Sequence, residues 1–193
     1  MIDPPIVYIE KEPFLAMLLA SIDTFKRECF GYIFGYKPTK NRNSFVITSA
    51  GEVGLTKKRK NKEVDQSVAS KKRMKSCFEK YPALFRPIGD FHSHPEWGEY
   101  TREPGLSDSD IEDMIKDEIP LGVVIKILSI NKERYAWERT STGGFIGSLG
   151  RYKFYFNAFR VFVDKEGKAR EQVLMIQAPA AIKALNRALG YQV

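Results

Sequence analysis

Histidine is scarce in this sequence: only His92 and His94 occur in 193 residues, and one serine separates them. Cysteine is equally scarce, and the two thiols, Cys29 and Cys77, are too few for a disulfide framework or for a zinc site built on cysteines. No run of apolar residues approaches the ~20 that a membrane span requires. These shortages exclude disulfide scaffolds, cysteine-rich zinc modules and membrane-spanning helices.

The start of the chain, MIDPPIVYIEKEPF, has acidic residues and prolines where a secretory signal has a basic and then an apolar run. With so few cysteines, this predicts a cytoplasmic protein that does not associate with membranes. Hydrophobic residues make up 43% of the chain and aromatic residues 12%, which is typical of a globular protein. A length of 193 residues fits one domain, so we expect residues 1–193 to form a single domain.

Positive charge is concentrated in one segment. The net charge is +7, and residues 57–75 contain nine Lys or Arg and two acidic residues, so the rest of the chain is neutral. The segment is either a solvated loop and helix face or a docking surface for an acidic partner. The segment contains no aromatic residue that could stack on bases, and the next one along the chain is Phe78, so the sequence disfavours nucleic acid as a partner.

Hydrophobic periodicity predicts a mixed α/β fold. Helices are expected at 13–27, at 107–118 and at 178–190, where Gly190 would end the last one. A further helix is expected after the loop 51–62, ending at about residue 81. Strands are expected at 28–36, 43–50, 86–94, 121–130, 151–164 and 170–177, with a turn at 165–168. Residues 121–130 are the most continuous apolar run and should form a central strand, with 134–140 paired to it. Pro95 is expected to end the strand 86–94, because proline cannot donate to a ladder.

The tripeptide HSH fits a metal site. If residues 86–94 are extended, His92 and His94 project from one face, and a catalytic zinc needs three protein ligands and one open position. An isolated H-x-H is more often a pair of surface or hydrogen-bonded histidines. The third ligand would be a nearby carboxylate, and Ser107 and Asp110 stand in S-x-x-D spacing. That spacing also fits a helix cap, and the two interpretations are compatible.

Three separated motifs together resemble the JAMM, or MPN-plus, metalloprotease family. HSHP at 92–95 matches H-x-H-P, LSDSD at 106–110 supplies S-x-x-D, and ECFGYIFG at 28–35 matches E-x-x-G-x-[LI]-x-G. The resemblance covers roughly residues 10–130 and implies an MPN-type fold, a central mixed sheet flanked by helices, with residues 131–193 completing or extending it. One feature differs: eleven residues separate Pro95 from Ser107, where the family usually has six.

The resemblance implies a role for each motif residue. His92, His94 and Asp110 would hold one Zn²⁺ per chain, Glu28 would be the general base, and Ser107 would donate a hydrogen bond to the oxyanion. The sequence next to these residues suggests two more assignments. Cys29 is expected to be a core residue and not a nucleophile. Asp90 is expected either to support a histidine or to lie at a solvent-exposed edge.

By this resemblance the chain would be a zinc-dependent isopeptidase or peptidase, similar to deubiquitinases, that cleaves amide bonds at the C-terminus of ubiquitin or a ubiquitin-like modifier. Conjugates of such modifiers would be its partners, whether it acts alone or in a larger proteolytic assembly. Residues 57–60 would fold over the tail of the modifier, and the loops 51–62 and 96–106 are expected to be mobile. The alternatives are an inert MPN scaffold and a hydrolase of small sulfur-carrier conjugates. All five motif residues are present, which disfavours the scaffold.

Overall fold

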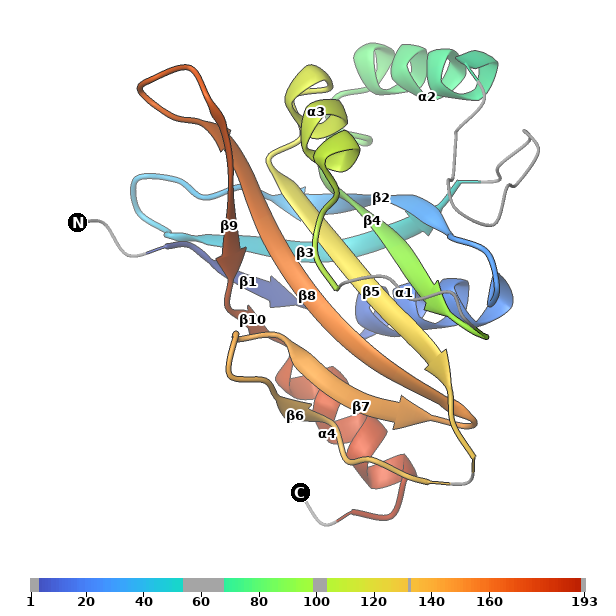
Figure 1. Cartoon of the computed structure of the whole chain (residues 1–193). Coiled ribbons are helices and arrows are strands. Elements are labelled where there is room, and N and C mark those ends of the chain that lie inside the picture. The colour runs from blue at the N-terminus through green and yellow to red at the C-terminus, as the bar shows by residue number, and fades with distance from the viewer. Residues whose placement is uncertain (1–3, 54–67, 99–103, 132, 192–193) are drawn as a thin grey trace.

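The computed structural model describes residues 4–53, 68–98, 104–131 and 133–191, which form one curled, mixed β-sheet and four helices (Figure 1). The helices are α1 (Lys11–Asp23), α2 (Val68–Lys80), α3 (Asp108–Lys116) and α4 (Pro179–Ala188). The strands are β1 (Ile6–Ile9), β2 (Phe30–Tyr36), β3 (Ser44–Glu52), β4 (Pro87–Glu96), β5 (Leu121–Ser129), β6 (Glu138–Arg139), β7 (Phe145–Leu149), β8 (Tyr152–Val163), β9 (Ala169–Leu174) and β10 (Ile176–Gln177). The strand order is β10-β1-β3-β2-β4-β5-β8-β7-β6, and β9 pairs with β8.

The main hydrophobic core lies between the sheet and α1, with α4 packed against α1. Phe14 of α1 is fully buried; its ring stacks on Phe156 at 4.4 Å and meets the edge of Trp137 at 5.5 Å. Along β4 and β5 the odd-numbered residues Phe91, Val123 and Ile125 belong to this core. Because side chains alternate along a strand, the even-numbered residues from Asp90 in β4 and from Gly122 in β5 onward face the opposite side of the sheet.

That opposite side carries α3. In Figure 1, α3 lies in front of the sheet and α1 behind it. Gly122 of β5 allows the close packing, because a Cβ atom there would lie 3.1 Å from Sδ of Met114 in α3. Helix α2 packs on the same side of the sheet through Phe78. The centroid of its ring lies 5.1 Å from that of Tyr32 and 6.0 Å from that of Phe34.

The central position expected for residues 121–130 is confirmed, since β5 lies between β4 and β8. The hairpin around 165–168 is also confirmed: β8 and β9 pair antiparallel, and Gly167 adopts a positive φ of 78° in the turn. Helix α4 ends as expected, with Gly190 at a φ of 86°. The four expected helices are present, although α1 begins two residues earlier than the sequence indicates and ends at Asp23.

The prediction that Pro95 ends its strand was wrong. Strand β4 continues through Pro95 to Glu96, and both residues stay paired with β5, opposite Ile127 and Leu128. The N–H of Ser93 points toward the β2 side, where it donates to the carbonyl of Cys29 at 3.1 Å. Backbone N–H groups alternate in direction along a strand, so the missing N–H of Pro95 faces the same side, beyond the start of β2. The proline therefore removes no ladder bond to β5.

The pairing expected for residues 134–140 was also wrong. Strand β6 pairs with β7 at the edge of the sheet, and β8 occupies the place beside β5. Strands β1 and β7 were not anticipated. Strand β1 has only four residues, two prolines precede it, and it pairs in parallel with β3 and β10, contacts that a local pattern does not indicate.

Several expectations fall on residues outside the described part of the chain. They include the basic residues 57–60, most of the loop 51–62, and residues 99–103 of the loop 96–106. The later part of the basic segment lies in α2, where Lys72, Arg73 and Lys75 are exposed. None of the described helices combines the length and the apolar composition that crossing a membrane would require.

Candidate metal centre

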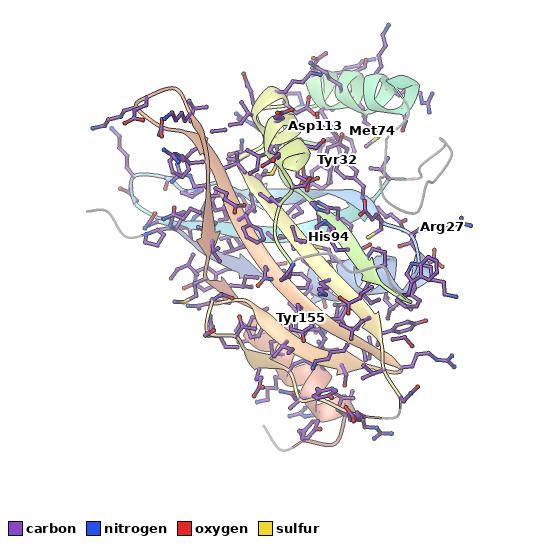
Figure 2. All side chains as sticks on the ribbon, viewed as in Figure 1. Arg27, Tyr32, Met74, His94, Asp113 and Tyr155 are labelled. Atoms are coloured by element: carbon purple, nitrogen blue, oxygen red, sulfur yellow. The ribbon has the colours of Figure 1, made fainter. Side chains whose placement is uncertain are left out.

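The two histidines lie side by side on β4, with side chains on the α3 side of the sheet. Their Nε2 atoms are 3.1 Å apart, and the side chains are almost inaccessible, with His92 7% and His94 1% exposed. Figure 2 shows His94 near the middle of the sheet, below α3 in that view. Two imidazole nitrogens that converge in a buried place are suited to share one cation.

Asp110 joins the histidines from the first turn of α3. Its Oδ2 atom is 3.6 Å from Nε2 of His92, and the three ligand atoms of His92, His94 and Asp110 all lie within 4.8 Å of one another. Ligands 2.0–2.1 Å from a tetrahedral zinc are separated from each other by about 3.3 Å. Two of the three separations, 3.1 and 3.6 Å, are close to that value, and the third is at most 4.8 Å. The group is therefore compatible with a metal ion.

Ser107 fixes the carboxylate by capping α3. The backbone N–H of Ser107 donates to Oδ2 of Asp110 at 2.7 Å, and the backbone N–H of Asp110 donates to Oγ of Ser107 at 3.2 Å. This reciprocal pair is a capping box with aspartate at its third position. The Ser107 hydroxyl also donates to Oδ2 of Asp110, at 2.6 Å. The helix cap and the carboxylate ligand are thus the same structural unit.

The surroundings of Asp110 favour its charged form. Burial alone would raise the pKa of this carboxyl, but the charge of His92 and the hydrogen bonds from Ser107 outweigh burial and hold the pKa below its ordinary value. Asp110 is therefore available as an anionic ligand over a wide range of pH.

Glu28 reaches the site from the segment before β2. Phe30 lies opposite His92 in the antiparallel pair of β2 and β4, and the bond from Ser93 to Cys29 extends this ladder by one residue. Continuing this register by one more residue puts Glu28 opposite His94. Opposed residues of an antiparallel pair project to the same side, so the Glu28 carboxylate belongs to the α3 side, and only 6% of the residue is exposed.

The position of α3 depends on Asn157, which sequence reasoning missed. Asn157 is in β8, on the same side of the sheet as the histidines and in one row with His92 and Val124. Its Nδ2 donates to the carbonyl oxygen of Pro104 at 3.1 Å and so anchors the chain just before α3. The sequence did hold a signal, because Asn157 is the one amide residue within the aromatic stretch YKFYFNAF.

A second residue missed from the sequence is Lys126 of β5. It occupies the register position opposite His94, and its Nζ atom pairs with Oε2 of Glu96 at 2.5 Å. Both side chains are partly buried, at 18% and 27% exposed. This ion pair lies on the same side of the sheet as the histidines and marks the end of the site toward the C-terminus of β4.

The structure tests the expectations for two residues next to the site. Cys29 is fully buried in the core, as expected, and burial raises the pKa of its thiol, although hydrogen bonds from Ser93 and Ser21 act in the opposite direction. Asp90 does not lie at a solvent-exposed edge: it is 7% exposed, on a strand between β2 and β5. It shares the side of the histidines, two residues before His92.

Comparison with solved structures shows a likeness of fold. The chain is similar to protein DSY2949 from Desulfitobacterium hafniense, whose solution structure matches with a TM-score of 0.50, 14% identity, and coverage of 90% of this chain and 94% of that chain. No family model matches this sequence, and neither does any curated protein. At this level of identity the likeness concerns the fold alone.

Proposed function

We propose that this protein is a zinc-dependent peptidase of the JAMM type, with an MPN-type fold, that hydrolyses peptide or isopeptide bonds at the C-terminus of ubiquitin or a ubiquitin-like modifier. The observation that carries the proposal is the convergence of the H-x-H and S-x-x-D motifs. Their possible ligand atoms on His92, His94 and Asp110 lie within 4.8 Å of one another, and the register of β2 and β4, continued to residue 28, directs Glu28 to the same side of the sheet. If the motifs matched the family only by chance, there would be no reason for the fold to bring them together.

The donor set supports zinc as the metal. Two imidazole nitrogens and one carboxylate oxygen form a three-ligand site of the kind that holds catalytic zinc and leaves a fourth position open. Calcium and magnesium prefer oxygen ligands, and six or more of them, which this group does not supply. His92, His94 and Asp110 would be the ligands, because their ligand atoms lie within 4.8 Å of one another.

Zinc in this position would supply Lewis acidity, which lowers the pKa of a water to about 7 and polarises the scissile carbonyl. Glu28 would take the proton of the attacking water on its carboxylate and pass it to the leaving amine. Its burial beside His94 keeps bulk water from competing for that proton.

Ser107 would stabilise the oxyanion. Its hydroxyl now donates to Oδ2 of Asp110, so this role requires the hydroxyl to rotate toward the substrate. Asp110 would keep the hydrogen bond from the backbone N–H of Ser107 after the rotation, so the helix cap would survive. Removal of one oxyanion donor in other hydrolases lowers kcat by about 10²–10³.

The choice of a ubiquitin-like substrate rests on the motif resemblance. The extended substrate tail would cross the site between α3 and the chain before β2, since Asp110 and Glu28 approach the histidines from those two elements. An inert scaffold would retain this architecture without hydrolysis, and a hydrolase of sulfur-carrier conjugates would use the same chemistry on a smaller leaving group.

The test combines metal analysis with cleavage of a ubiquitin-like conjugate by wild type and by Glu28→Gln. We expect about one zinc per chain in both proteins and cleavage by the wild type only, because the base is lost while the ligands stay. Glu112→Gln is the matched control, since Glu112 is exposed on α3, and it should cleave at the wild-type rate. Full activity of Glu28→Gln would refute the mechanism, and bound zinc without cleavage by the wild type would favour the scaffold.

A further inference from the structure

Ser93, the residue between the two histidines, points away from the candidate site. Because His92 and His94 project to the α3 side, the Ser93 side chain projects to the α1 side, where it is fully buried. Its Oγ atom accepts a hydrogen bond of 2.8 Å from the backbone N–H of Cys29. A serine in this place therefore touches the backbone of the residue that follows Glu28, from the side of the sheet opposite the metal ligands.

This contact replaces part of the regular ladder. In an antiparallel sheet the two residues of a hydrogen-bonded pair exchange both N–H···O=C bonds. The pair of Cys29 and Ser93 makes one of them, from the N–H of Ser93 to the carbonyl of Cys29 at 3.1 Å. The N–H of Cys29 goes to the Ser93 hydroxyl instead. The Ser93 side chain thus holds the backbone of Cys29, which lies between Glu28 and the start of β2.

We propose that Ser93 is a positioning residue that sets the place of the Glu28 carboxylate relative to the histidines. This inference rests on the proposed function, in which Glu28 is the base. Ser93 connects Glu28 and the ligands directly: it is covalently adjacent to His92 and His94 and is bonded to the residue next to Glu28. One hydroxyl therefore fixes the distance between the base and the metal ligands without touching substrate.

A merely structural role would have different consequences. Cys29 is buried, so loss of the hydroxyl leaves a buried N–H without its acceptor and lowers stability in either case. A positioning role also predicts a change confined to the chemical step, because a base displaced by about 1 Å can cost on the order of 10²-fold in rate. Zinc retention should not change, since the Ser93 side chain projects to the side of the sheet opposite His92, His94 and Asp110.

The experiment compares Ser93→Ala with Ser21→Ala. Ser21 is the matched control, because it is also fully buried and its Oγ lies 3.8 Å from the Sγ of Cys29, but it does not bond to the Cys29 backbone. For Ser93→Ala we expect wild-type zinc content, a KM within about two-fold of wild type, and a kcat per bound zinc lower by roughly ten- to a hundred-fold. Ser21→Ala should lower the melting temperature and leave kcat per zinc unchanged.

One further measurement isolates the link to Glu28. Hydrogen exchange gives a readout without activity: the Cys29 amide should be as protected as the β2 ladder amides in the wild type, and should exchange at least about ten-fold faster in Ser93→Ala. The protection of the Cys29 amide in the wild type tests the contact with Ser93 even if Ser93→Ala fails to fold.

The outcomes separate this inference from the proposed function. Wild-type kcat in Ser93→Ala with an inactive Glu28→Gln would overturn the positioning role and leave the mechanism intact. An active Glu28→Gln would overturn the mechanism and this inference together. An unprotected Cys29 amide in the wild type would show that the contact with Ser93 does not persist in solution and would overturn the inference.

Discussion

The side-chain amide of Asn157 donates a hydrogen bond of 3.1 Å to the carbonyl oxygen of Pro104, across 53 positions of sequence. This bond joins strand β8 to the segment that enters α3, three residues before the helix cap at Ser107. Asp110 therefore reaches the histidines from a helix whose entry is fastened to a different strand. This bond itself involves none of the three candidate ligands.

Replacing Asn157 by alanine should weaken zinc binding although every ligand remains. Loss of the bond to Pro104 frees the chain before α3, and supporting residues of this kind typically contribute 10- to 100-fold in metal affinity. We expect a fall in that range, measured by competition with a zinc chelator. Asn186→Ala is the control, because Asn186 is also buried and holds the Trp137 backbone far from the site; it should lower the melting temperature and leave zinc affinity unchanged.

Asp110→Asn should lose the metal, and Asp113→Asn should retain it. Both residues belong to α3, but Asp113 is exposed and Asp110 faces the histidines. The amide keeps the size of the side chain and can still accept from Ser107, so the helix should form while the anionic ligand is lost. Metal analysis would check the loss of zinc, and far-ultraviolet circular dichroism would check that the helix still forms. Equal zinc content in the two variants would contradict the ligand assignment.

Gly31, the glycine of E-x-x-G, should tolerate no side chain. A Cβ atom there would lie 2.2 Å from the ring of Phe91 and 2.4 Å from the carbonyl oxygen of Gly51. Gly31→Ala must therefore displace a buried ring or a strand, at a cost of about 3 kcal/mol. The expected fall in melting temperature is roughly 6–12 °C.

Gly51→Ala serves as the control for Gly31→Ala, because no heavy atom lies within 4 Å of a Cβ at Gly51. Its stability should stay within about 0.5 kcal/mol of wild type. Similar melting temperatures for the two variants would mean that β2 and β3 are further apart than the structure has them.

Thiol labelling should distinguish the two cysteines. Burial raises the pKa of Cys29, so at any given pH its reactive thiolate is rarer than in an ordinary cysteine, and the side chain is also shielded from reagent. Cys77 is only partly buried. Near pH 8 we expect one thiol to react in the native protein and two in denaturant. Rapid labelling of both thiols in the native state would contradict the burial of Cys29.

The sequence by itself determined most of the local elements and the candidate ligands. Helical spacing in residues 13–27 and 178–190 predicted α1 and α4, and the continuous apolar run at 121–130 predicted the central strand. The two-residue period of a strand was enough to place His92 and His94 on one side of the sheet, and S-x-x-D spacing was enough to predict the cap that Ser107 and Asp110 form. These features depend on interactions within a few residues, which a single sequence contains.

Only the tertiary structure decided which segments meet. Pro95 stays within β4 because its missing N–H faces a side where β2 has not begun, and β6 lies at the sheet edge because β8 fills the place beside β5. The bonds from Asn157 to Pro104 and from Cys29 to Ser93 span 53 and 64 positions. A hydrogen bond between distant segments depends on the packing of the whole sheet, and no pattern of neighbouring residues encodes it. For this protein, local pattern supplied the candidate ligands, and long-range packing set the distances between them.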